Sequence, residues 1–128
     1  MENNDFGFEQ HTVWKKARDF KREVCKDTRA FPPEEKYRLT DQLIRSSRSV
    51  NALISEGHGR YTYPEQINDC IPARDSLSET INHLIDAHDE EYITEEKLQY
   101  YKAKGKELER LMNGYIGYLR EKRDEQKK

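Results

Sequence analysis

The sequence predicts an all-α protein that folds as an up-down-up-down antiparallel four-helix bundle. Charged residues make up 38% of the 128 residues and hydrophobic residues only 34%, which is typical of helices that bury one stripe and expose the rest. Apolar residues recur at intervals of three and four in four segments; turns that contain proline or glycine separate the first three, and residues 89–93 separate the third from the fourth. No segment competes as a strand, and short connections between helices favour antiparallel neighbours.

The first predicted helix runs from about Gln10 to Ala30. It ends at Phe31-Pro32-Pro33 because the residue before a proline is pushed out of the α region. The apolar stripe that it would bury contains Val13, Trp14, Ala17, Phe20, Val24 and Thr28.

The second predicted helix opens with Pro33 near its first position and ends at Gly57 and Gly59, which resemble a C-cap. Several serines make its stripe narrow, so a neighbouring helix can approach closely. The predicted stripe contains Tyr37, Thr40, Ile44, Ser47, Val50 and Ile54.

The third predicted helix begins at Pro64-Glu65, after a turn at residues 61–63. Pro72 lies inside it, where a proline removes a backbone hydrogen bond and clashes with the preceding turn. We therefore expect a bend or an irregular start between Pro64 and Ala73. The apolar stripe contains Ile67, Ile71, Leu77, Ile81, Leu84 and Ile85.

The fourth predicted helix has Thr94 as its N-cap and a heptad seam sustained for three repeats. The charged tail from Arg120 to Lys128 is expected to be frayed or disordered. The whole chain, residues 1–128, is then one bundle domain with its core at about residues 8–120. The seam contains Leu98, Tyr101, Gly105, Leu108, Met112, Tyr115 and Leu119.

Composition and motifs favour a non-enzymatic cytoplasmic protein. No apolar run approaches the ~18 residues of a membrane span, and residues 1–5 show no secretory signal. Two cysteines fit a reducing compartment. No Glu-x-x-His pair or Gly-x-Ser-x-Gly elbow occurs. We therefore expect no catalytic residue, no metal and no cofactor.

The net charge of -2 conceals an uneven distribution along the chain. Residues 14–60 carry 12 bases and 7 acids, whereas residues 61–113 carry 6 bases and 12 acids. Such a surface can present one side to an anionic partner. The alternative is that these charges are ordinary solvated helix faces.

The basic and aromatic residues of the first half are the candidate nucleic-acid site. Arginine forks suit phosphates, and tyrosine rings can stack on unpaired bases. The alternative is that the arginines pair with the acidic third helix, for example with Asp69 or Glu79, within the bundle or across a subunit contact. The candidate residues are Arg38, Arg45, Arg48, Arg60, Tyr61, Tyr63, Lys15 and Arg22, to which the tail bases Lys122, Arg123, Lys127 and Lys128 could add.

Several motifs resemble a bacterial family of four-helix-bundle proteins first noticed as reading frames within intervening sequences of 23S ribosomal RNA genes. Residues 31–45 resemble its Phe-Pro, acidic, Tyr, Leu-Thr, Gln, Arg signature. Residues 55–60 match its small-Glu-Gly-x-Gly-Arg element, and residues 73–79 match its Ala-Arg-Gly-Ser-Leu-x-Glu element. Ser49-Val50, Trp14, Ala17 and Tyr92-Ile93 also fit the family pattern, and the resemblance covers roughly residues 8–120.

The resemblance implies an up-and-down bundle that assembles as a homo-oligomer, a ring-shaped pentamer. Relatives include the accessory protein of diversity-generating retroelements, which partners a reverse transcriptase and binds nucleic acid. The resemblance therefore implies that the protein binds nucleic acid, RNA more than DNA, as an accessory to a reverse transcriptase. The alternative is an oligomeric protein-interaction scaffold that binds no nucleic acid. Leu53 and Asp75 depart from the family's usual Asn and Gly, and Pro72 is unusual in its helix.

Overall fold

The computed structural model describes residues 4–127. Met1–Asn3 and Lys128 lie outside the described residues. Part of what the sequence predicts for the two ends of the chain concerns these residues. Residues 4–127 contain helices and no strand, so the all-α prediction is confirmed. The elements are the 3-10 turn η1 (Gly7–Gln10), α1 (Thr12–Thr28), the 3-10 turn η2 (Pro33–Glu35), α2 (Leu39–His58), α3 (Tyr63–Asp89) and α4 (Glu95–Gln126).

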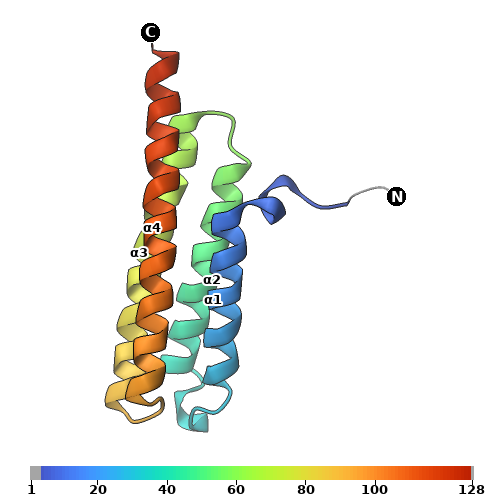
Figure 1. Ribbon diagram of the computed structural model, residues 1–128. Helices are drawn as coiled ribbons and strands as arrows, with labels where there is room; N and C mark the ends of the chain where they lie inside the picture. Colours follow the sequence, from blue (N-terminus) through green and yellow to red (C-terminus); the bar gives the residue numbers. More distant parts are fainter. Residues whose placement is uncertain (1–3, 128) are drawn as a thin grey trace.

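The helices form a bundle in which each helix runs opposite to the one before it (Figure 1). Each helix contacts its neighbour in sequence, and α1 also contacts α4, which closes the bundle. The N-terminal segment with η1 lies beside the upper end of α1 and contacts α2.

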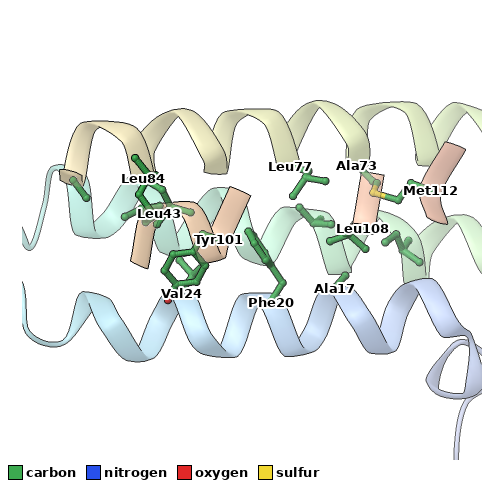
Figure 2. Packing of buried hydrophobic residues seen from close by; sticks show 14 of the residues in the cluster. Ala17, Phe20, Val24, Leu43, Ala73, Leu77, Leu84, Tyr101, Leu108 and Met112 are labelled. Atoms are coloured by element: carbon green, nitrogen blue, oxygen red, sulfur yellow. The ribbon is translucent and has the colours of Figure 1, made fainter. Parts of the chain in front are cut away.

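The core lies along the axis between the helices (Figure 2). Val24, Leu43, Leu84 and Tyr101 are buried with at most 1% of their surface exposed. Each fully buried side chain of this size contributes roughly 1.5–3 kcal/mol of hydrophobic free energy. The seam predicted for α4 is confirmed, except that Ile116 takes the buried position expected for Tyr115.

Small residues let α2 and α3 approach closely, as their sequence predicts. The Thr80 hydroxyl donates a 2.8 Å hydrogen bond to Ser46, and the hydroxyls of Ser49 and Ser76 lie 3.0 Å apart. Such short side chains reach one another only where the two backbones are close, and the hydrogen bonds satisfy hydroxyls that burial removes from water.

The predicted start of the second helix is wrong. Pro33 begins only a short 3-10 turn, and α2 begins at Leu39, after a non-helical Arg38 (φ -121°, ψ -108°). The chain must change direction here because both Phe31 and Leu39 are buried in the core. Tyr37, expected in the buried stripe, is therefore 84% exposed.

The irregular start predicted for the third helix is not observed. The helix begins at Tyr63 and continues through Pro72 to Asp89, with the Thr62 hydroxyl accepting a hydrogen bond from the Glu65 amide. Pro72 is exposed, and so is Asn68, whose carbonyl loses its helical donor to the proline ring. Water can therefore replace the missing hydrogen bond.

The prediction of a frayed tail from Arg120 onward is also wrong, because α4 continues to Gln126. Ile116 and Leu119 pack against Ile67 and Cys70 of α3, which holds the last part of α4 on the bundle. Beyond that contact, a 3.5 Å ion pair between Lys122 and Glu125 supports the last turns.

Candidate nucleic-acid interface

A row of cations follows the outer face of α1. The helix buries Val13, Ala17, Phe20, Val24 and Thr28, so the opposite face is exposed to solvent. The cations are three or four residues apart and span 14 residues, or about 21 Å along the helix axis. They are Lys15, Arg18, Arg22, Lys26 and Arg29, all exposed.

Between α1 and α2 lies a cleft of about 400 Å³, here called the basic groove. Within residues 4–127, none of its cations forms an ion pair, whereas Asp27 of α1 is paired with Lys97 of α4. The residues that line the basic groove are Lys21, Arg22, Lys26, Arg29 and Arg48, together with Glu23 and Cys25.

Two polar contacts join α1 and α2, and the second of them lies at the basic groove. The Asn51 side-chain amide donates a 3.2 Å hydrogen bond to the carbonyl of Trp14. The Cys25 thiol lies 3.8 Å from the Ser47 hydroxyl. These contacts set the separation of the helices, and therefore bring Arg48 of α2 to the cations of α1.

The opposite side of α1, which faces α4, has its charges paired. Lys16 lies 3.6 Å from Glu107, and Lys97 lies 3.4 Å from Asp27. The Tyr100 hydroxyl donates a 2.8 Å hydrogen bond to Glu23. Lys16, on the α4 side of α1, is therefore ion-paired, whereas the cations of the basic groove are not.

Two of the predicted contacts face solvent: Arg45 lies on α2, and Arg38 immediately precedes that helix. The Arg45 side chain is 78% exposed, and its guanidinium lies 3.7 Å from Asp41, one helical turn earlier. An exposed pair of this kind contributes little stability, so Arg45 is available to another anion. Arg38 is exposed and forms no ion pair with any residue in the range 4–127.

Arg60, another predicted contact, is ion-paired within the bundle instead of joining the basic groove. Its guanidinium donates a 3.1 Å hydrogen bond to Asp69 and a 2.7 Å hydrogen bond to Glu56, and the Asp69 contact is the larger cause of a raised arginine pKa. For Arg60, therefore, the structure shows the alternative that the sequence left open. Glu79, the other acid considered, lies 3.5 Å from His83 instead.

The two predicted stacking residues differ in exposure. Tyr61 is fully exposed in the turn between α2 and α3. Tyr63 is half-buried against the Ile67 and Cys70 cluster, so most of its ring is already packed. Lys122 and Arg123 of the tail pair with Glu125 and Asp124, respectively.

Sequence analysis named Arg22 and Arg48 of the basic groove, and Lys15 outside it, but did not name the three other cations that line it. Lys21, Lys26 and Arg29 line it beside Arg22. A signal was present, because the bases of α1 repeat at helical spacing on the face opposite its apolar stripe.

Other kinds of site find little support in the described chain. Residues 4–127 contain no group of three or more His, Cys, Asp or Glu side chains placed to hold a metal ion. None of the helices in this range is long and apolar enough to cross a membrane. Burial raises the pKa of the Cys70 thiol to about 11, which keeps it protonated and unreactive at neutral pH.

Comparison with known proteins agrees with this architecture. A crystal structure of a protein with unknown function from the S23 ribosomal protein family of Bacteroides thetaiotaomicron matches with a TM-score of 0.75 and 24% sequence identity. The match covers 82% of this chain and 98% of that one, and at this identity it shows a shared fold. No curated protein gives a significant match. The family model of the 23S rRNA-intervening sequence protein matches residues 9–114, and the chain belongs to that family.

Proposed function

We propose that this protein binds nucleic acid, RNA rather than DNA, through the basic groove, and that its role is binding without catalysis. One observation carries the proposal: five cations line one cleft, and none of them is neutralised within residues 4–127. Grouped like charges repel one another, and an anion that binds among them relieves the repulsion. Arginine forks and lysine ammonium groups are the usual partners of phosphate.

The dimensions of the α1 face suit a nucleic-acid backbone. Its cations extend over about 21 Å. One strand of a duplex places a phosphate every ~3.4 Å, so about six phosphates can lie along it. The description of the family refers to 23S rRNA intervening sequences, which supports an RNA-related role over a DNA-related one.

The proposal includes assembly as a homo-oligomer, a pentamer, as the family resemblance implies. Several copies of a modest site then bind one long RNA with higher avidity than a single copy. If the protein accompanies a reverse transcriptase, the basic groove would hold the RNA that the enzyme uses. Measurement of the oligomeric mass by sedimentation equilibrium tests the assembly on its own, without RNA.

The binding test is a salt titration with a structured RNA, followed by fluorescence anisotropy. For about six phosphate contacts, the logarithm of the association constant should fall with the logarithm of salt concentration with a slope of about -5. Arg22→Glu and Arg48→Glu should each weaken binding and reduce the magnitude of the slope. Arg110→Glu is the matched control, because Arg110 is exposed on α4 and makes no ion pair within residues 4–127.

Two results would overturn the proposal. RNA binding that is absent at low salt, or that Arg110→Glu weakens as much as Arg48→Glu does, would show that the basic groove is not an RNA site.

The alternative function is a protein-interaction scaffold, in which the exposed arginines contact the next subunit or a protein partner. Arg45 separates the two functions because it is 78% exposed and only loosely paired with Asp41. For an RNA-binding protein, Arg45→Glu should weaken RNA binding and leave the oligomeric mass unchanged. For a scaffold held together by these arginines, the same variant should dissociate the oligomer.

A further inference from the structure

Tyr37 is an exposed aromatic residue in the connection between α1 and α2. Its side chain is 84% exposed, and the Lys36 ammonium lies 5.3 Å from the centre of its ring. Arg38, the next residue, has no ion-pair partner within residues 4–127. The ring therefore adds almost nothing to the hydrophobic core, and it stands between two cations.

We infer that Tyr37 is a stacking platform for an unpaired nucleotide at the end of an RNA stem whose backbone lies along the basic groove. This inference rests on the proposed function and names the kind of RNA that the site selects. Unpaired bases stack on exposed aromatic rings, and neighbouring cations hold the adjoining phosphates. A base inside a stem already stacks on both faces, so it cannot use the ring.

Tyr37 lies in the α1–α2 connection, at the end of the bundle that holds Arg29 of the basic groove. Arg45 and Arg48 are exposed on α2, and the exposed Arg38 immediately precedes it; at the helical rise, the ten steps from Arg38 to Arg48 correspond to about 15 Å. That distance equals about four nucleotides at ~3.4 Å each. The α1–α2 connection also follows Arg29, the last cation of the groove on α1, at the lower end of the bundle (Figure 1).

The carboxylates near Tyr37 are partly engaged elsewhere. Glu35 accepts a 3.0 Å hydrogen bond from the Tyr92 hydroxyl, and Asp41 lies 3.7 Å from Arg45. Neither Glu34 nor Glu35 forms an ion pair with Lys36 or Arg38 within residues 4–127. Both cations beside the ring are therefore available to a phosphate.

Tyr61 is the natural comparison, because it is also exposed but has different neighbours. It lies at the other end of α2, next to Arg60, whose guanidinium is bound by Glu56 and Asp69. A ring beside a neutralised arginine lacks the charge that would hold the adjoining phosphate. This difference favours Tyr37 over Tyr61 as the stacking residue.

The test compares two RNA hairpins of identical stem, one blunt and one with a three-nucleotide single-stranded end that carries 2-aminopurine. The wild-type protein should bind the second hairpin about 5- to 150-fold more tightly, the range that base stacking on an aromatic side chain produces. Binding should also quench the 2-aminopurine fluorescence. Tyr37→Ala should abolish the preference and the quenching while leaving the affinity for the blunt hairpin unchanged. Tyr37→Phe, which keeps the ring, and Tyr61→Ala should behave as wild type.

The outcomes separate this inference from the proposed function. Equal binding of both hairpins, lost in Arg48→Glu, would overturn the stacking role of Tyr37 and leave the basic groove in place. A preference lost in Tyr61→Ala and kept in Tyr37→Ala would also overturn it. Binding of neither hairpin would refute the proposed function itself, and the inference with it. Circular dichroism of each variant confirms that these exposed substitutions leave the fold intact.

Discussion

Replacement of Tyr101 by phenylalanine tests how α1, which carries the basic face, is held on the bundle. Tyr101 of α4 is fully buried, and its hydroxyl donates hydrogen bonds to the Asp27 carboxylate and to the Glu23 carbonyl, 3.0 Å away. Tyr101→Phe keeps the ring against Phe20, 5.9 Å between centroids, and removes only the hydroxyl. Any change in stability therefore reports on these polar contacts.

The cost follows from what the hydroxyl leaves behind. A hydrogen bond to a charged group contributes roughly 1.5–3 kcal/mol. Asp27 keeps an ion pair with Lys97 at 3.4 Å, and its side chain is 29% exposed, so the lower half of that range applies, about 1.5–2 kcal/mol. For a chain of this length, about 1 kcal/mol corresponds to roughly 4 °C, so the expected loss is about 6–8 °C in Tm.

Thermal unfolding followed by circular dichroism measures this loss, and urea unfolding gives the free energy independently. The pKa of Tyr101 is raised, first by burial and then by the Asp27 hydrogen bond. A raised pKa means that the fold holds the phenol proton, so the stability is complete below pH 10 and declines above it. The wild type should therefore lose more stability above pH 10 than Tyr101→Phe does. An unchanged Tm in Tyr101→Phe would refute the reasoning, because it would mean that these hydrogen bonds do not hold α1 on α4.

Three further predictions address the N-terminal cap, the groove and α4. His11 Nδ1 accepts a hydrogen bond from the Val13 amide, and burial and then His58 lower the pKa of His11. As the pH drops below 6.5, the unfolded chain therefore binds the His11 proton first, and the stability measured by urea unfolding should fall. The fall should be smaller in His11→Asn, which keeps a capping oxygen. Saturating RNA should slow the maleimide modification of Cys25, which lines the basic groove, whereas the buried Cys70 should stay unreactive with or without RNA; an unchanged Cys25 rate would place the RNA elsewhere. Gly114→Ala should stabilise the protein by about 1 kcal/mol, because a Cβ there has no neighbour within 4 Å among the described residues; a lower Tm would show that another chain packs on that face.

Helical periodicity alone identified most of the architecture. The α4 seam illustrates this, since six of its seven predicted positions are buried, including Leu98, Tyr101 and Met112. Apolar spacing is a local property of the chain, and a helix that buries one stripe must place that stripe in the core. The all-α class and the four helices follow from patterns of this kind, and the serines of α2 predicted the close approach of a neighbouring helix.

The start of α2 and the end of α4 could not be obtained in the same way. Pro33 and the glutamates after it have the local signature of a helix start, but burial of both Phe31 and Leu39 turns the chain before α2 begins. The end of α4 lacks apolar residues, yet packing of Leu119 on α3 carries the helix further. In both places tertiary contacts outweigh local propensity.

The candidate site shows the same division. The sequence by itself determined that cations are concentrated in the first half of the chain and that Lys15 and Arg22 share a helix face with other bases. Only the tertiary structure decided that Arg48 joins the cations of α1, that Arg60 is neutralised by Asp69, and that Tyr37 is exposed. The physical reason is that an ion pair or a groove depends on the distance between side chains of different helices. Packing of the core sets that distance, whereas spacing along one helix is set by its own backbone.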